Sequence, residues 1–147
     1  MVRYCLWTLL VGIALLQCGC AGIRPPPGAV MTKRTLLTTG YCGCGKCCDW
    51  QRKNGHIVDR AGRPKHVGIT ASGSHASRGT IAADTRVYPF GTVMEIPGYG
   101  YGRVEDRGGA IKGDHVDLYF GSHKEALRWG KQLLRVKIWI KRMTTRR

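Results

Sequence analysis

Short apolar runs broken by glycine dominate the chain from residue 35 onward. The clearest run, LLRVKIWIK at residues 133–141, alternates apolar residues with charged residues and a tryptophan. An alternation with a period of two predicts a half-buried β-strand. Further short strands are predicted at residues 35–42, 65–73, 79–85, 91–98, 102–106 and 115–120.

One predicted helix interrupts this series of strands. Ser122 and Glu125 form an S-x-x-E capping box, and Gly130 supplies a stop signal. The segment between them is long enough for a helix of about two turns. Many short strands with one short helix predict a mainly β fold in the form of a small closed barrel.

The strand predicted at residues 115–120, HVDLYF, has two chemically different faces. Its apolar residues share one face, which leaves Asp117 on the other face between a histidine and a tyrosine. Asp106 ends the preceding strand, and the glycines of RGGAIKG, among them Gly108 and Gly109, permit a tight path and close approach of a ligand. Neighbouring carboxylates raise the pKa of one member, which suits acid catalysis near neutral pH. The alternative is a group of surface acids that balance the many cations.

A cysteine cluster, YCGCGKCCDW, contains Cys42, Cys44, Cys47 and Cys48. Four thiolates can hold a structural zinc ion, although this spacing is not that of a standard zinc finger. Disulfides are the competing interpretation outside the cytoplasm. Adjacent Cys47 and Cys48 would pair only through a strained ring, so a disulfide would join one of them to Cys42 or Cys44. In either case, a zinc ion or disulfide bonds would hold this loop in a fixed conformation.

The charge balance and the N-terminus together indicate where the protein works. With 24 Lys and Arg against 9 Asp and Glu, the formal net charge is +15, which predicts an anionic partner. Arg3 followed by the apolar run 6–16 is typical of a secretory signal and is shorter than the roughly 20 residues of a membrane-spanning helix. We therefore expect a protein secreted across the inner membrane, either periplasmic, anchored to the outer membrane or at the cell surface. This location excludes nucleic acid as the partner.

The end of the signal allows more than one form of processing. LLQCGC resembles a lipoprotein box, in which Cys18 or Cys20 would carry a lipid that anchors the protein to a membrane. Cleavage after Ala21 and an uncleaved anchor are the alternatives. The expected organisation is a signal peptide at 1–20 (a lipoprotein signal being one form), a Pro-rich linker at 21–34, the domain at 35–142 and a basic tail at 143–147.

The segment GTIAADTRVYPFGTVMEIPGYGYGRVEDRGGAIKGDHVDLYF resembles the bacterial 3D domain, a family named for three aspartates. The matching elements are A-x-D, P-x-G-T, a G-Y-G turn, D-x-G-G-A-I-K-G and an aspartate before an aromatic residue. They identify the three aspartates as Asp84, Asp106 and Asp117. Position alone predicts only an Asx-turn for Asp84. The resemblance covers residues 38–140 and implies a small six-stranded double-psi β-barrel with one short helix.

The family is related to the catalytic domain of membrane-bound lytic transglycosylase A, and this relation implies peptidoglycan as the substrate. Asp117 corresponds to the catalytic acid, which would cut the bond between N-acetylmuramic acid and N-acetylglucosamine. Asp106 would tune Asp117 and accept substrate hydroxyls, while Asp84 would hold the barrel loops or a sugar hydroxyl. No cofactor is expected.

The resemblance also suggests groups that bind the glycan. They are Lys112, the backbone N–H groups of Gly108 and Gly109, and, as weaker candidates, Thr70, Ser72 and Tyr41. The second domain that completes the sugar groove of the transglycosylase has no counterpart in this sequence, so we expect a lower affinity for glycan. The alternatives are a non-catalytic module that binds peptidoglycan and a structural envelope protein that grips anionic polymer or membrane.

Overall fold

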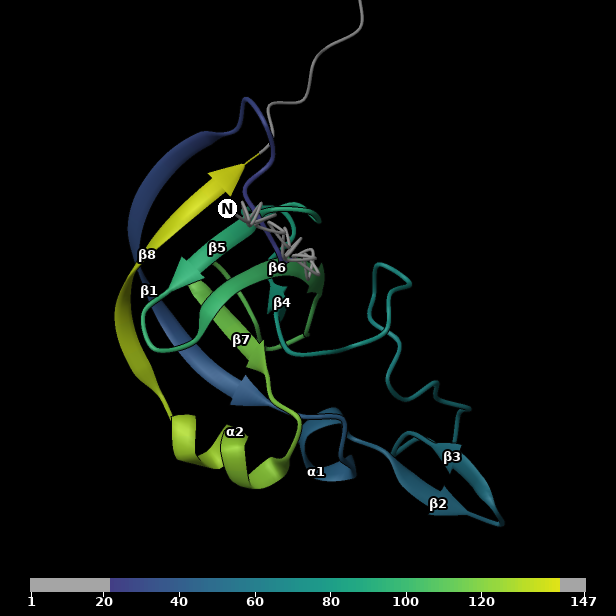
Figure 1. The fold of residues 1–147 in the computed structure, drawn as a ribbon. Coiled ribbons are helices and arrows are strands. Elements are labelled where there is room, and N and C mark those ends of the chain that lie inside the picture. Colours follow the sequence, from purple (N-terminus) through teal and green to yellow (C-terminus); the bar gives the residue numbers. More distant parts are fainter. Residues whose placement is uncertain (1–21, 141–147) are drawn as a thin grey trace, which may run out of the picture.

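The computed structural model describes residues 22–140, in which six strands close into a barrel and two short helices lie near one of its ends (Figure 1). The predicted signal peptide, the lipidation candidates Cys18 and Cys20, and the basic tail lie outside the described residues. In chain order the elements are β1 (Val30–Tyr41), α1 (Gly45–Cys48), β2 (Gln51–Lys53), β3 (His56–Val58), β4 (Thr80–Ala83), β5 (Val93–Ile96), β6 (Gly100–Asp106), β7 (His115–Tyr119), α2 (His123–Trp129) and β8 (Gln132–Ile140). None of the helices among residues 22–140 has the length and apolar character needed to cross a membrane.

The barrel strands follow one another in the order β1-β7-β4-β6-β5-β8, and β8 closes the ring by pairing with β1. The pairs β1–β7 and β4–β6 are parallel, and the other four pairs are antiparallel. This pattern is unchanged when β1, β4 and β5 are exchanged with β6, β7 and β8. Each strand therefore pairs only with strands of the other set, as expected for two interleaved halves. The prediction of a mainly β, six-stranded barrel is confirmed.

The strand alternation and the helix cap predicted from the sequence are both present in the structure. In β7, Val116 and Leu118 are fully buried inside the barrel, while Asp117 between them is half-buried on the outer face. In β8, Val136 and Ile138 contribute to the same core. The capping box of α2 is complete in both directions. A Cβ atom on Gly40 would lie 2.9 Å from the carbonyl oxygen of Ala126, so only glycine lets β1 pass this close to α2.

Residues 65–73, predicted as a strand, instead form a loop with an isolated bridge between Ile69 and His75. Gly68 and Gly73 have φ values of +83° and +88°, which turn the backbone away from an extended path. The Gly73 N–H donates to the Thr70 carbonyl and closes a turn. The apolar residues in this run therefore do not indicate a strand.

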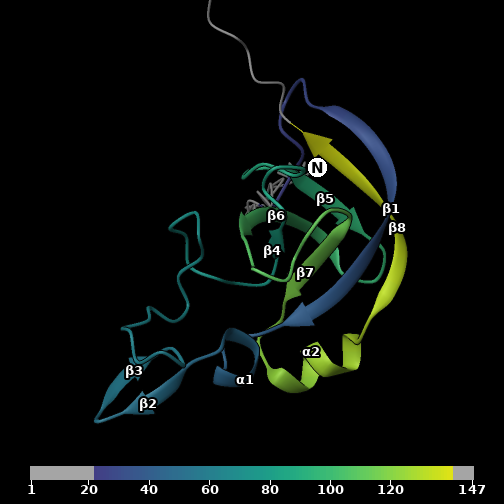
Figure 2. The ribbon, with the colours of Figure 1, turned by 180° about the vertical axis from the view of Figure 1, so that it is seen from behind.

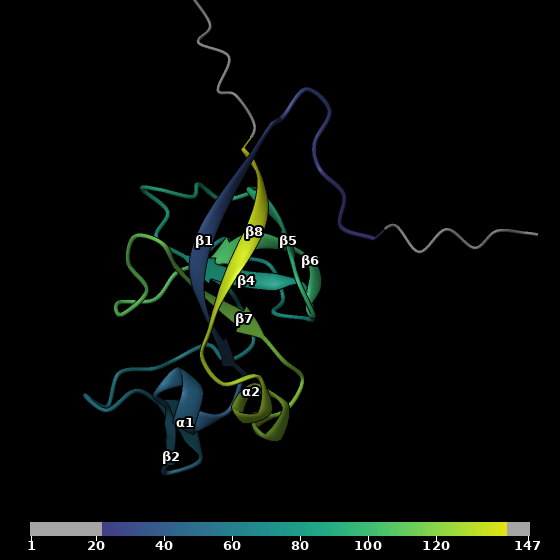
Figure 3. The same ribbon diagram turned by 90° about the vertical axis from the view of Figure 1, so that its left-hand side faces the viewer.

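The barrel begins at Val30, before the expected domain start at residue 35 and inside the predicted linker. Residues 30–38 pair antiparallel with β8, and Figure 3 shows these two long strands side by side. Residues 30–35 are exposed, so this end of β1 lacks the alternation that marks a half-buried strand.

Three short elements were not expected from the sequence: α1, β2 and β3. The hairpin β2–β3 projects away from the barrel, as both Figure 1 and the reverse view in Figure 2 show. Its turn consists of Asn54 and Gly55, both with positive φ. An Asn-Gly pair is the strongest local hairpin signal, so this hairpin could have been predicted. Helix α1 has four residues, too few to show a helical period.

Candidate active site

One row of residues crosses four adjacent strands of the barrel. Thr39 of β1 lies beside Asp117 of β7, which lies beside Ala82 of β4, which lies beside Asp106 of β6. A cleft of about 650 Å³ opens along this row, and Asp106, Asp117 and Ala82 all line it. The structure thus places the two aspartates on opposite sides of a small alanine.

A β-bulge brings Asp106 to the cleft. Val104 pairs with Ile81, and both are fully buried in the core. The next residue of β4, Ala82, pairs with Asp106 rather than with Glu105, so one residue of β6 is extra. Without the extra residue, strict alternation would put Asp106 on the same core face as Val104. The bulge therefore aims Asp106 outward, to the same side as Asp117.

Three donors hold the carboxylate of Asp106. The phenol of Tyr41 donates to its Oδ2 at 3.2 Å, and the backbone N–H groups of Ala71 and Arg107 donate to its Oδ1 at 3.0 and 2.9 Å. Burial, together with the neighbouring carboxylate of Asp106, raises the pKa of Tyr41 far above its ordinary value, so this phenol stays protonated and serves as a donor. Asp106 is thus fixed in position by contacts from β1, from the 65–79 loop and from its own chain.

Asp117 has a different environment. The hydroxyl of Thr39 donates to its Oδ1 at 2.7 Å, and the same hydroxyl lies 2.9 Å from Nε2 of His115. Since Thr39 gives its proton to Asp117, it can accept one from the imidazole. Burial raises the pKa of Asp117, the negative charge of Asp106 adds to this, and the Thr39 hydrogen bond and His115 oppose it. The balance leaves the carboxyl easier to protonate than an ordinary aspartic acid.

Aromatic and basic side chains surround the two acids. The rings of Tyr41 and Tyr119 meet edge to face with centroids 5.3 Å apart, and both residues line the cleft. Lys65 and Arg107 also line it. The cleft therefore combines an aromatic wall, three carboxyls (those of Asp49, Asp106 and Asp117) and two cations, a mixture suited to a polar ligand.

Asp84 lies outside this cleft. Its side chain is 5% exposed and accepts from Nε and Nη2 of Arg86 at 3.0 and 2.8 Å and from the backbone N–H of Gly113 at 3.2 Å. The hydrogen bond from the Arg86 guanidinium, followed by that from Gly113, lowers the pKa of Asp84 well below its ordinary value. Gly113 has a φ of +58° in the loop that joins β6 to β7. Asp84 thus ties that loop to the end of β4.

The predicted glycan-binding residues separate into three groups. Tyr41, Gly108 and Gly109 line the cleft with Asp106 and Asp117. Lys112 lines a different depression, which it shares with Asp84. Thr70 is buried, and its hydroxyl contacts Ser72 and the N–H of Ser74 inside a turn. That turn places the Ala71 N–H where it donates to Asp106. Thr70 therefore affects the cleft indirectly, by holding this turn.

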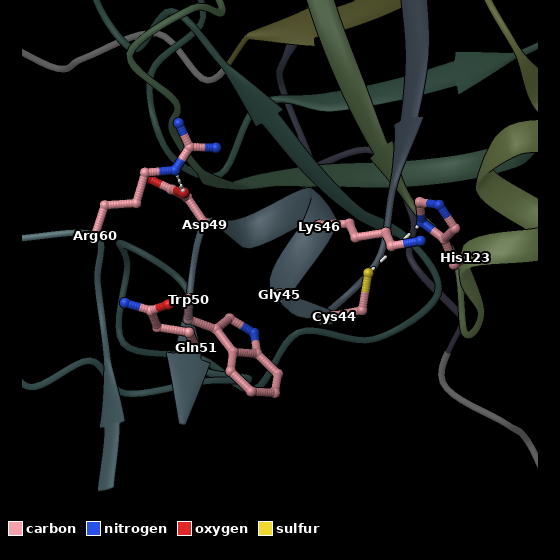
Figure 4. Close-up of a pocket in the computed structure, with 8 residues that line it drawn as sticks. All are labelled: Cys44, Gly45, Lys46, Asp49, Trp50, Gln51, Arg60 and His123. Carbon is pink, nitrogen blue, oxygen red and sulfur yellow. Dashed lines mark hydrogen bonds and ion pairs between the residues drawn. The ribbon is translucent and has the colours of Figure 1, made fainter. Parts of the chain in front are cut away.

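The four clustered cysteines are all free in the structure, and three of them converge on a histidine from α2. The ligand atoms of Cys42, Cys44, Cys47 and His123 all lie within 4.8 Å of one another. Figure 4 shows Cys44 and His123 pointing toward each other across the hollow beside α1. Cys48 points elsewhere and donates to the Cys42 carbonyl at 3.1 Å.

Two residues of these sites could not be selected from the sequence. Thr39 reaches Asp117 because β1 and β7 are parallel neighbours, and a strand pairing of this kind has no local signal. His123 joins cysteines that lie 76 and more positions earlier in the chain. A histidine beside the cap of a predicted helix, in a chain with a cysteine cluster, is the only sequence clue to it.

Among solved structures, the chain is similar to the lytic transglycosylase MltA of E. coli. The structure of MltA with bound chitohexaose aligns at 26% identity with a TM-score of 0.43, over 49% of this chain and 27% of that one. Another MltA structure aligns at 26% identity with a TM-score of 0.42, over 54% of this chain and 30% of that one.

Two relatives come from Bacillus subtilis. YabE, named for cell wall shaping, is 37% identical over 112 residues, which are 76% of this chain and 23% of YabE. YocH, named as a cell wall-binding protein, is 36% identical over 75 residues, which are 48% of this chain and 26% of YocH. The chain thus spans about a quarter of the length of these relatives.

The family model of the 3D domain matches residues 79–141. The matched stretch begins just before β4 and contains all three aspartates of the family motif together with the bulge and the glycine-rich loop. The resemblance seen in the motifs is thereby confirmed, and residues 79–141 belong to the 3D domain family.

Proposed function

We propose that this protein cleaves the glycan strands of peptidoglycan as a lytic transglycosylase, with Asp117 as the general acid and base. One observation carries the proposal: Asp117 and Asp106 line the same cleft, and burial raises the pKa of Asp117. Among the residues that the structure describes, no ion pair involves Asp117. Partial removal of a carboxyl from water favours its protonated form, which a general acid requires.

The substrate class is supported by the family and by the two relatives. The relation of the 3D domain family to a lytic transglycosylase implies peptidoglycan as the substrate, and the names of YabE and YocH refer to the cell wall. The predicted secretory signal and the net charge of +15 agree with a protein that acts on an anionic polymer of the cell envelope. We therefore place the protein in the cell envelope.

The proposed reaction starts from protonated Asp117. Its proton passes to the oxygen between N-acetylmuramic acid and N-acetylglucosamine, the bond from C1 to that oxygen breaks, and an oxocarbenium-like transition state forms. The Asp117 carboxylate then takes the proton of the muramyl 6-hydroxyl as O6 bonds to C1. The product is a 1,6-anhydro sugar. Because the muramyl 6-hydroxyl is the nucleophile, no water is consumed, and Asp117 regains its proton.

Neighbouring residues would prepare Asp117 for both steps. The fixed negative charge of Asp106 favours the acid form before bond cleavage. The Thr39 hydroxyl stabilises the carboxylate that remains after cleavage, because it donates to Oδ1. The Asp106 oxygens already accept from Tyr41, Ala71 and Arg107, which suits a positioning role in the cleft.

A non-catalytic peptidoglycan-binding module is the second candidate, favoured by the name of YocH as a cell wall-binding protein. Tyr41, Tyr119 and Arg107 would serve a binder as well as an enzyme, since all three line the cleft. The raised pKa of Asp117 separates the two functions, because a binder gains nothing from a carboxyl that is easily protonated.

The decisive experiment is to incubate the purified protein with sacculi and to search the soluble products for anhydro-muropeptides by mass spectrometry. We expect anhydro products from the wild type and none from Asp117→Ala, with both proteins retained on sacculi. Retention without any product from the wild type would establish the binding module instead. Reducing sugar ends without anhydro products would mean hydrolysis.

A further inference from the structure

We propose that Cys42, Cys44, Cys47 and His123 bind a structural zinc ion that clamps α1 to α2 beside the cleft. The proposal does not depend on the glycan reaction. It rests on the arrangement of four ligand atoms from three parts of the fold. Cys42 follows the last residue of β1, Cys44 and Cys47 belong to the cap and the body of α1, and His123 is the first residue of α2.

The spacing of the ligand atoms fits tetrahedral coordination. Zn–S bonds of about 2.3 Å and a Zn–N bond of about 2.0–2.1 Å place two tetrahedral sulfurs about 3.8 Å apart and a sulfur and nitrogen about 3.6 Å apart. The Sγ atoms of Cys42 and Cys47 are 3.7 Å apart. Nδ1 of His123 lies 3.6 Å from Sγ of Cys44 and 3.3 Å from Sγ of Cys47. Three separate distances thus agree with a single metal position.

The chemistry of the ligand set selects zinc. Three thiolates and one imidazole form the Cys₃His set of structural zinc sites, in which the protein fills all four positions. A disulfide between two of the cysteines would leave the third thiol and the histidine without a reason to converge. Lys46 lies beside Cys44 and His123 (Figure 4), where its charge would offset that of three thiolates around a dication.

Cys48 is excluded from the ligand set by its direction. Its Sγ donates to the carbonyl of Cys42, and the residue lines the cleft together with Asp106 rather than the metal position. Cys48 is therefore a matched control for the other three thiols, because it lies in the same short segment and is also free.

Helix α1 needs a clamp of this kind. It has four residues, none of them buried, and no side-chain hydrogen bond caps its start. So short a helix is unstable by itself, and here no apolar face packs it against the barrel. A zinc ion that bonds Cys44 and Cys47 on one side and His123 on the other would supply the missing free energy. Because Cys47 also lines the cleft, the same ion would fix one wall of the candidate active site.

The test is the metal content of the full chain, purified under reducing conditions without chelator and measured by plasma mass spectrometry. We expect about one zinc ion per chain in the wild type and in Cys48→Ser, and loss of the metal in Cys44→Ser and in His123→Ala. Loss in Cys48→Ser equal to that in Cys44→Ser would overturn the assignment, as would wild type that stays metal-free after addition of zinc to the reduced protein.

A second variant covers the case in which Cys44→Ser and His123→Ala fail to fold. His123→Cys should still bind metal, because four thiolates also form a structural zinc site. With Co²⁺ as the probe, its sulfur-to-cobalt charge-transfer band should be stronger than that of the wild type, since it has one more thiolate. An unchanged band would show that residue 123 does not coordinate the metal. Mass mapping of the native protein that finds Cys42 joined to Cys47 would establish the disulfide instead.

Discussion

Asp84 and Asp117 belong to the same three-aspartate motif, yet the structure gives them opposite acid–base properties. Asp84 is almost fully withdrawn from water, but Arg86 and the Gly113 N–H stabilise its charge, and its pKa is lowered. Asp117 accepts from the Thr39 hydroxyl in place of a guanidinium, and burial raises its pKa. Charged and N–H partners thus set the pKa of Asp84, whereas burial is the main cause of the raised pKa of Asp117.

The opposite pKa shifts indicate different roles for the two residues. A carboxyl that holds its charge at almost any pH is a poor acid but a good anchor, and Asp84 fastens the glycine-rich loop that leads into β7. A carboxyl that accepts a proton readily suits the chemistry that we propose for Asp117. Asp84 then contributes to catalysis only by keeping β7 and its aspartate in place.

The largest expected effect is on the reaction. Asp117→Asn should reduce the release of anhydro-muropeptides by about 10²–10⁴-fold, the range for loss of a general acid–base group. Asp84→Asn should lose activity only in proportion to the fraction of protein that is unfolded. Product release per mole of folded protein measures the difference. Equal losses in the two variants would mean that Asp84 takes part in the chemistry.

The second expected effect is on thermal stability. Here the substitution of Asp84 should have the larger effect and that of Asp117 the smaller. Asp84→Asn should lower the melting temperature by several degrees, because Arg86 and Gly113 lose a charged acceptor. Asp117→Asn should leave it nearly unchanged. Thermal unfolding followed by circular dichroism gives both values. Glu95→Gln, which breaks the partly exposed ion pair with Lys137, is the control and should change little. A stable Asp84→Asn would contradict the anchor role.

The third effect is a pair of opposite pH slopes. The folded-state pKa of Asp84 is lowered, so the wild type should be more stable than Asp84→Asn above about pH 4 and should lose this advantage as the pH falls. The folded-state pKa of Asp117 is raised. Relative to Asp117→Asn, the wild type should therefore be most stable below about pH 4 and should lose stability as the pH rises. Urea unfolding across a pH series measures both slopes, and slopes of the same sign would refute the contrast.

The smallest effect is a shift in the pH profile of the reaction. The Thr39 hydroxyl lowers the pKa of Asp117, so Thr39→Val should raise that pKa further. The decline of activity on the basic side should then move to higher pH, by less than about one pH unit. Thr39→Ser keeps the hydroxyl and should keep the wild-type profile. A shift toward lower pH in Thr39→Val would show that the hydroxyl favours the protonated carboxyl.

The barrel was largely predictable because its strands either alternate clearly or end at strong turn signals. Val136 and Ile138 in β8 and the cap at Ser122 behave as the pattern requires. The failures have two causes. Residues 30–34 and helix α1 bury little, so they leave no hydrophobic pattern, and residues 65–73 are apolar without being a strand.

The candidate site was predictable only in part. Alternation alone assigns Asp117 to the outer face of its strand, as the structure has it. The same rule puts Asp106 inside the barrel, and a bulge at Glu105 reverses that outcome. The contacts of Thr39 and His123 depend on strand and helix neighbours that are distant in sequence, and these require the fold.

The interleaving of the two barrel halves has a consequence for when the cleft comes into existence. Thr39 and Ala82 belong to one half, and Asp117 and Asp106 belong to the other, so the row of the site takes alternate members from each. Neither half contains two strands that pair with each other, and β1 pairs only with β7 and β8, the last two barrel strands along the chain. Such long-range pairing is slow to form. The row of the site is therefore incomplete until β7, the last of its four strands along the chain, has been synthesised and has paired with β1 and β4.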